Sequence, residues 1–129
     1  MKYNDLTEQI IKAFFKVYNT LGYGFLEKVY ENALHLELCS LGLQSNKQQQ
    51  IDVYYSGKKV GEYYADIVVN DVIIIEIKAH ECLHVEHEHQ LVNYLKATHI
   101  EVGLLLNFGR KPEVKRKVFD NELKIIAHK

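Results

Sequence analysis

The segment Val72–Lys78 constrains the fold of this chain more than any other part of the sequence. Its continuous β-branched run is typical of a strand at the centre of a sheet. Because side chains alternate along a strand, the odd-numbered isoleucines point to one face, and Ile74, Glu76 and Lys78 point to the other. Charge on a central strand is costly to bury unless it is paired or bound to a metal ion. The alternative for this E-x-K pattern is a solvated salt bridge at the edge of the sheet, since lysine and glutamate are rarely fully buried.

A second carboxylate, Asp66, lies ten residues before Glu76 and interrupts the preceding apolar segment. A two-residue turn at Asn70-Asp71 would pair Asp66 with Ile75 and send the two carboxylates to opposite faces. A three-residue loop, or one bulge, would instead pair Asp66 with Glu76. If the two carboxylates act together, the hairpin between them is therefore expected to be irregular.

Asp66, Glu76 and Lys78 together indicate metal-dependent chemistry on a phosphate. Two adjacent carboxylates repel each other and raise each other's pKa, and a hard divalent cation relieves this repulsion. Mg²⁺ prefers carboxylate and water oxygens and usually takes one or two protein carboxylates. Lys78 would position a water molecule or stabilise charge growing on the phosphate. Phosphodiester hydrolysis requires these parts: a metal ion, an attacking water and positive charge.

Hydrophobic periodicity places further elements around these two segments. Asp5 followed by Glu8 resembles a capping box at the start of a first helix that ends near Thr20. Beyond it the sequence predicts a helix at about 25–41, strands at 50–55, 60–69 and 72–78, a helix at about 84–98, a strand at 102–107, and a further strand around 115–119 in an ambiguous tail at 114–126. This αα-βββ-α-β(β) order predicts an α/β fold, with a mixed sheet flanked by helices, in a single domain at 1–129.

Composition argues against a membrane protein. No apolar run approaches the ~20 residues of a membrane span, and the N-terminus lacks the apolar core of a signal peptide. We therefore expect a cytoplasmic protein. In that compartment Cys39 and Cys82, which show no metal or redox spacing, are expected to be buried thiols.

Net charge gives no support to nucleic-acid binding, because its formal value is -1. Basic residues are nevertheless concentrated in one short stretch, as Arg110, Lys111, Lys115, Arg116 and Lys117. This cluster is either a solvated surface or a contact for phosphate groups.

Spacing places several polar side chains on shared helix faces. Glu27 and Glu31 are four residues apart, and the simpler interpretation is that both are solvated. His87, Gln90 and Tyr94 also share a face, a pattern that is more often packing than catalysis.

Three histidines raise the alternative of a zinc site. His84, His87 and His89 lie in an acidic stretch, but on a helix only the first two share a face, whereas a zinc site needs converging ligands. An auxiliary contact between His87 and a phosphate is the more plausible role.

Four motifs in a fixed order make the chain resemble a known family. The segment Gly24–Glu31 (GFLEKVYE) matches the name of the small bacterial GxxExxY proteins, and the likeness continues to Asn107-Phe108-Gly109. The chain is identified as a member of that family, within the PD-(D/E)XK nuclease superfamily. It also resembles RecB-like nuclease domains, whose motifs fall here at Gly24–Glu27, Asp66, Glu76–Lys78 and Gln90–Tyr94. The proline of the superfamily name is absent, because Tyr64-Ala65 precede Asp66.

The resemblance implies a restriction-endonuclease-like core and a nuclease that uses Mg²⁺ or Mn²⁺ to hydrolyse phosphodiester bonds through metal-activated water. The implied site residues are Glu27, Asp66 and Glu76 for the metal ion, Lys78 for catalysis, and Gln90, Tyr94, Tyr30 and His87 for the substrate. By default, however, Tyr30 is a core or rim aromatic. The partner would be nucleic acid, with DNA favoured over RNA. A homodimer or a protein partner would supply the specificity element that so small a domain lacks.

The alternative is a catalytically silent adaptor that keeps the nuclease fold and binds nucleic acid or protein. Near-neutral charge and small size favour the adaptor. The complete set of site residues argues against it, because a decayed site would be expected to lose Lys78 or a carboxylate. A third interpretation, a structural protein with an incidental E-x-K, requires Asp66 and Glu76 to lie far apart.

Overall fold

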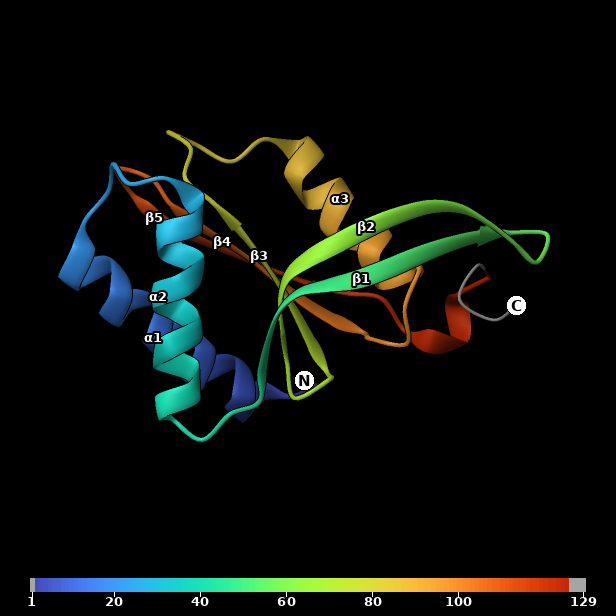
Figure 1. Cartoon of the computed structure of the whole chain (residues 1–129), viewed down its shortest axis with the longest axis horizontal. Helices are drawn as coiled ribbons and strands as arrows, with labels where there is room; N and C mark the ends of the chain where they lie inside the picture. Colours follow the sequence, from blue (N-terminus) through green and yellow to red (C-terminus); the bar gives the residue numbers. More distant parts are fainter. Residues whose placement is uncertain (1, 126–129) are drawn as a thin grey trace.

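A five-stranded sheet with three flanking helices is built from these segments (Figure 1). The structure is a computed structural model that describes residues 2–125. The strands lie side by side in chain order, as β1 (Ser45–Tyr55), β2 (Lys58–Val69), β3 (Ile73–Lys78), β4 (Val102–Phe108) and β5 (Pro112–Val118). The helices are α1 (Asn4–Leu21), α2 (Glu27–Ser40) and α3 (Val85–Lys96), and a short 3₁₀ helix follows at Asn121–Leu123.

This element order confirms the predicted α/β fold with a mixed sheet. The pair β3–β4 is parallel, and α3 forms the crossover that parallel neighbours require. The other neighbouring strands are antiparallel. The strand expected around 115–119 is confirmed as β5, whereas Ile126, the last residue of the ambiguous tail, lies outside the described residues.

The two faces of β3 pack into separate cores. Ile75 lies beneath α1 and α2 in a cluster that includes Phe14 and Leu34. Ile74 faces α3 and packs in a second cluster with Leu91. Because alternate residues enter different cores, the predicted alternation along β3 is confirmed, and Glu76 and Lys78 are placed on the α3 side.

Strands β1 and β2 continue past the sheet as a two-stranded ribbon, drawn in green in Figure 1. Strand β2 pairs with β1 along most of its length but with β3 only through the three residues Ile67–Val69. Ile51 and Ala65 of the ribbon pack in the same cluster as residues of α3. The ribbon therefore leaves the sheet and covers part of α3. Strand β1 begins at Ser45, earlier than the predicted 50, because its first residues are polar and give no apolar alternation.

Two smaller predictions are wrong. Asp5 and Glu8 form no capping box, because α1 begins at Asn4 after Tyr3, and Asp5 lies in the first turn, where it favours the helix dipole. Both cysteines are free and exposed, at the C-terminal end of α2 and in the loop after β3.

None of the helices in the described range 2–125 combines the length and apolar character needed to cross a bilayer.

Candidate active site

The hairpin between β2 and β3 has a three-residue loop. Val69 pairs with Ile73, and Asn70 and Asp71 in the loop both adopt left-handed backbone, with φ of 51° and 58°. Continuing this register sets Asp66 opposite Glu76. The irregular hairpin predicted from the sequence is thus confirmed.

Asp66 and Glu76 mark the point where β2 and β3 separate. The backbone N–H of Asp66 donates to Glu76 Oε2 at 2.9 Å, and the N–H of Ile77 donates to Asp66 Oδ2 at 2.7 Å. Each carboxylate therefore accepts a bond from the opposite strand, in the place of a ladder carbonyl. These bonds satisfy the backbone where regular pairing ends and hold the two carboxylates side by side.

Burial makes this pair electrostatically strained. Burial, followed by the charge of Asp66, raises the pKa of Glu76 to about 8. Burial also raises the pKa of Asp66, although its bond from Ile77 opposes the shift. The charge of Lys78 lowers the pKa of both carboxyls, so its ammonium lies within electrostatic reach of the pair. With respect to residues 2–125, Lys78 forms no hydrogen bond or ion pair, which leaves it available to a ligand.

Two residues extend the site: Glu31, which the simpler interpretation of the sequence wrongly left in solvent, and Gln48, which the sequence did not indicate. Glu31 of α2 is only 4% exposed and pairs with Lys28 at 2.9 Å. Gln48 of β1 donates through Nε2 to Glu31 Oε1 at 2.8 Å and to Asp66 Oδ1 at 3.4 Å. Its backbone is left-handed, with φ of 53°, which is uncommon for a residue other than glycine. Gln48 thus links α2 to the carboxylate pair.

Glu27 does not complete a three-carboxylate metal site, contrary to expectation. Its side chain is 46% exposed, and its Oε2 atom lies 3.6 Å from Nε2 of His80. Its charge still contributes to the raised pKa of Glu76. Within the described part of the chain, no three His, Cys, Asp or Glu side chains converge so that they could hold a metal ion. Of the three predicted metal ligands, Asp66 and Glu76 lie side by side, and Glu27 lies apart from them.

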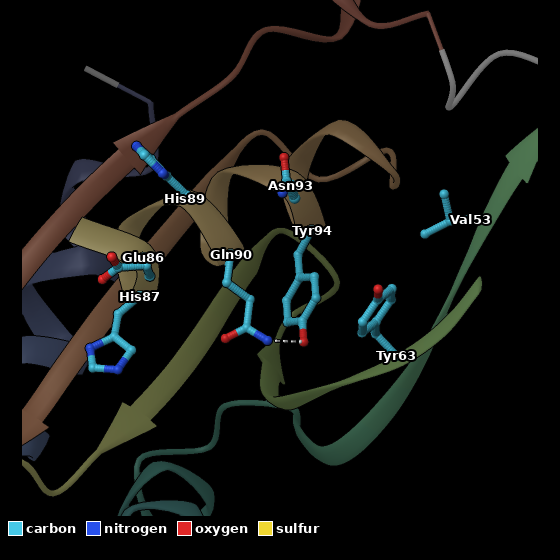
Figure 2. Close-up of a pocket in the computed structure, with 8 residues that line it drawn as sticks. All are labelled: Val53, Tyr63, Glu86, His87, His89, Gln90, Asn93 and Tyr94. Carbon is cyan, nitrogen blue, oxygen red and sulfur yellow. Dashed lines mark hydrogen bonds between the residues drawn. The ribbon is translucent and has the colours of Figure 1, made fainter. Parts of the chain in front are cut away.

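A histidine cluster lies beside Glu27, and it contains His84 and His87 of the zinc alternative together with His80, in place of His89. The ring of His87 lies 4.8 Å from that of His80 and 5.5 Å from that of His84, between centroids. His89 points away from His87 in Figure 2. Burial and the charge of Lys78 lower the pKa of His87, which places this ring near the lysine.

Tyr30 cannot contact substrate as predicted, because it belongs to the core. It is fully buried and stacks on Phe108, with ring centroids 4.3 Å apart. Its hydroxyl donates to the carbonyl of Gly22 at 2.6 Å and accepts the N–H of Phe25 at 3.2 Å. Tyr30 therefore holds the loop between α1 and α2, and the default interpretation of a core aromatic is correct.

Gln90 and Tyr94 lie on the site-facing side of α3. Gln90 Nε2 donates to the Tyr94 hydroxyl at 3.0 Å (Figure 2). Burial, then the charges of Glu76 and Asp66, raise the pKa of Tyr94 to about 12, so the hydroxyl lies near the carboxylates. Both side chains border a pocket of about 540 Å³ between α3 and the ribbon. Its lining comprises Val53, Tyr63, Glu86, His87, His89, Gln90, Asn93 and Tyr94.

Asn107 is a further site residue that sequence reasoning did not select. It is fully buried at the end of β4, and its side chain bonds both the N–H and the carbonyl of His80, each at 2.9 Å. These bonds fix the chain just after Lys78. Gly109 allows the same approach, because a Cβ there would lie 2.1 Å from the His80 carbonyl oxygen. A polar residue in the apolar run VGLLLN was the available signal.

The basic stretch at 110–117 is divided among several partners. Arg110 pairs with Glu81 at 3.4 Å, and Lys117 pairs with Glu88 at 2.6 Å. Arg116 donates to the carbonyl of Lys2 at 2.6 Å. These contacts favour the simpler interpretation of this stretch as surface.

Two solved structures are similar to this fold. No match is found among curated proteins. The crystal structure of SSO0001 aligns with a TM-score of 0.56 and 17% identity, covering 92% of this chain and 60% of that one. The crystal structure of an alkaline exonuclease (LHK-Exo) from Laribacter hongkongensis aligns with a TM-score of 0.50 and 13% identity, covering 95% of this chain and 74% of that one. At such identities these likenesses concern the fold.

A family model of the PD-(D/E)XK nuclease superfamily matches residues 4–117. The matched range includes both strands that carry the carboxylates, the lysine at the end of β3, and the whole of α3. On this evidence the chain belongs to the PD-(D/E)XK nuclease superfamily.

Proposed function

We propose that this protein is a nuclease of the GxxExxY type, with its site in one domain, that hydrolyses phosphodiester bonds with the help of Mg²⁺ or Mn²⁺. DNA is the favoured substrate over RNA. The observation that carries the proposal is the Asp66–Glu76 pair, which is held side by side where β2 leaves β3, with Lys78 in electrostatic reach.

The donor set of this pair suits a hard divalent cation. It consists of carboxylate oxygens, and the charge of Asp66 contributes to the raised pKa of Glu76, so a cation would offset the cost of ionising both groups. Asp66 and Glu76 would hold the cation directly, and Glu27, whose charge already acts on Glu76, would help to hold it through a water molecule. When bound, the cation would supply Lewis-acid stabilisation of phosphate charge and lower the pKa of a water molecule.

The chain's own groups would orient the substrate around this centre. Lys78 is the proposed catalytic lysine, because its ammonium can donate to a phosphate oxygen or to the attacking water. Tyr94 accepts the bond from Gln90, so its own hydroxyl proton is left to donate to the substrate. His87 lies near Lys78 and is proposed as an auxiliary phosphate contact.

A cleavage screen tests the proposal. Purified protein is incubated with single-stranded, duplex and branched DNA and with RNA, in Mg²⁺, in Mn²⁺ or in chelator. We expect cleavage only with the cation, and a loss of roughly 10²–10³ in rate for Lys78→Ala, the scale of removing one group that stabilises developing charge. Lys115→Ala, which alters a surface lysine of β5, is the matched control. Absence of cleavage of every substrate, with no effect of Lys78→Ala, would overturn the catalytic proposal.

An adaptor without catalytic activity is the second candidate. The observation that favours it is the position of Glu27, which contacts His80 and leaves the carboxylate pair without a third ligand. An adaptor of this kind would bind nucleic acid or protein equally well with and without divalent cations, which separates the two candidates.

A further inference from the structure

The pocket between α3 and the ribbon lies beside the proposed centre, and two of its lining residues, Tyr63 and Asn93, have no role in the chemistry described above. We propose that this pocket receives an unpaired nucleobase next to the cleaved phosphodiester, so that the substrate class is single-stranded nucleic acid. The inference rests on the proposed function and deepens it, and its central residues are Tyr63 and Asn93.

The pocket adjoins the carboxylates. Tyr94 forms part of its wall, and the hydroxyl of this residue lies near Glu76 and Asp66. Tyr63 precedes Asp66 by three residues on β2, a separation of about 10 Å along a strand, and its ring packs on Tyr94, which places it on the same side as the carboxylates. A strand of nucleic acid whose phosphate lies at Asp66 and Glu76 would therefore bring a neighbouring base to Tyr63.

The lining beyond His87 suits a base better than a phosphate. None of the eight lining residues is a lysine or an arginine, and one of them, Glu86, would repel an anion. The ring of Tyr63 is 48% exposed and is braced by Tyr94, with centroids 5.7 Å apart, so it offers an oriented aromatic surface for stacking. Charge thus directs phosphates towards Lys78, and the base into the pocket.

Asn93 supplies the hydrogen-bonding groups that a base edge requires. It is exposed on α3 at the pocket, and its side-chain amide bonds no other residue within 2–125. An amide offers both donors and an acceptor, which suits the edge of an unpaired base. The pocket volume of about 540 Å³ falls in the range of small-molecule sites.

A duplex cannot use such a pocket without disruption. Its bases are stacked and their edges are paired, so a base would have to leave the helix to enter a pocket. Single strands present their bases freely, and stacking on an aromatic side chain tolerates any base. The same chemistry serves single-stranded DNA and single-stranded RNA, and the experiment includes both.

The ribbon itself provides a matched control. Tyr63 and Tyr64 are adjacent on β2 and are 48% and 45% exposed. Neighbouring residues of a strand point to opposite faces, and the Tyr64 hydroxyl donates to Glu62, away from the pocket. Replacing each tyrosine therefore removes a similar exposed ring, but only one of the two rings lies in the pocket.

The test measures binding in a Lys78→Ala background, without divalent cation, so that no cleavage intervenes. The probes are oligonucleotides of about a dozen nucleotides that carry 2-aminopurine, as single-stranded DNA, single-stranded RNA and duplex. We expect single strands to bind more tightly than duplex and the 2-aminopurine fluorescence to be quenched by stacking. Tyr63→Ala should weaken single-strand binding roughly 5- to 100-fold and abolish the quenching, while Tyr63→Phe should retain both.

Tyr64→Ala should change the affinity by less than about twofold, as expected for an ordinary surface substitution. Equal affinity for duplex, no binding of any probe, or equal losses in Tyr63→Ala and Tyr64→Ala would overturn the pocket assignment. If the cleavage screen fails but Tyr63-dependent binding persists, the proposed function is wrong and the pocket assignment stands. If cleavage occurs and Tyr63→Ala leaves both binding and quenching unchanged, the reverse is true.

Discussion

The two faces of the sheet are made by alternate residues of the same strand, β3, but only the face under α1 and α2 is apolar along the whole strand. On the side of α1 and α2, Ile75 and Ile77 are at most 1% exposed within an apolar cluster. On the side of α3, Ile74 is followed by Glu76 and then by Lys78. Identical backbone geometry therefore supports a conventional core on one side and a charged site on the other.

The difference follows from how each face is covered. Helix α3 packs its apolar second half on the sheet, where Gly103 lets Leu91 approach so closely that a Cβ would lie 2.6 Å from it. Its first half carries His87, which lies near Lys78, and Gln90, which bonds Tyr94 near the carboxylates. The ribbon diverges at the same point (Figure 1). The charged residues Glu76 and Lys78 thus lie where the apolar packing between α3 and the sheet ends.

The largest effect is expected when a carboxyl group is moved by one residue along β3, from the face under α3 to the face under α1 and α2. Ile75→Glu would bury a carboxylate on the apolar face, where no backbone N–H or cation can compensate it. We expect a loss of more than about 5 kcal/mol, comparable with the whole stability of a small domain, so the variant should not fold at neutral pH. Urea denaturation followed by circular dichroism measures this. Ile75→Leu is the control, and a folded Ile75→Glu with near-normal stability would contradict the contrast between the faces.

On the face under α3, removing a charge should instead make the protein more stable at alkaline pH. The pKa of Glu76 is raised from 4.5 to about 8. Between these values the native state holds a proton that the unfolded state releases, so the stability of the wild-type protein falls as pH rises, by up to tenfold in the unfolding equilibrium per pH unit. Glu76→Gln lacks this proton and should escape the loss.

Without divalent cation, the stability of Glu76→Gln relative to wild type should therefore increase by up to roughly 10³ from about pH 5 to about pH 8. Urea denaturation of both proteins at several pH values measures the difference and cancels the contributions of other groups. Adding Mn²⁺ at the alkaline end should stabilise the wild type more than the variant. Parallel pH profiles for the two proteins would show that Glu76 does not carry the strain assigned to it.

A smaller effect on stability is expected at Gln48, which links α2 to the carboxylate pair. Gln48→Ala and Gln48→Gly both remove the bonds to Glu31 and Asp66, but only glycine relieves the left-handed backbone. We expect the glycine variant to be more stable than the alanine variant by about 1 kcal/mol. Thermal unfolding of the two variants measures this, and a more stable alanine variant would contradict the assigned strain.

Much of this organisation was predictable from local sequence patterns. Alternation along β3 predicted which residues share a face, because every side chain of a strand follows the same period. The hairpin loop was predictable only conditionally, since Asn70-Asp71 suits either of two loop lengths that lead to opposite faces. The burial of Glu31 depends on its contact with a distant strand, and four-residue spacing indicates only that it shares a face with Glu27. Gln48 left no local signal, because its conformation and partners arise from tertiary structure.

The most direct test of the carboxylate pair as a metal site is calorimetric titration of the wild-type protein and Asp66→Asn with Mn²⁺ near neutral pH. Asparagine keeps the size of the side chain and removes its charge. We predict saturable Mn²⁺ binding by the wild type, with release of the Glu76 proton, and loss of that binding in Asp66→Asn. Absence of binding by the wild type, or an unchanged isotherm in the variant, would contradict the central claim that Asp66 and Glu76 form a cation site.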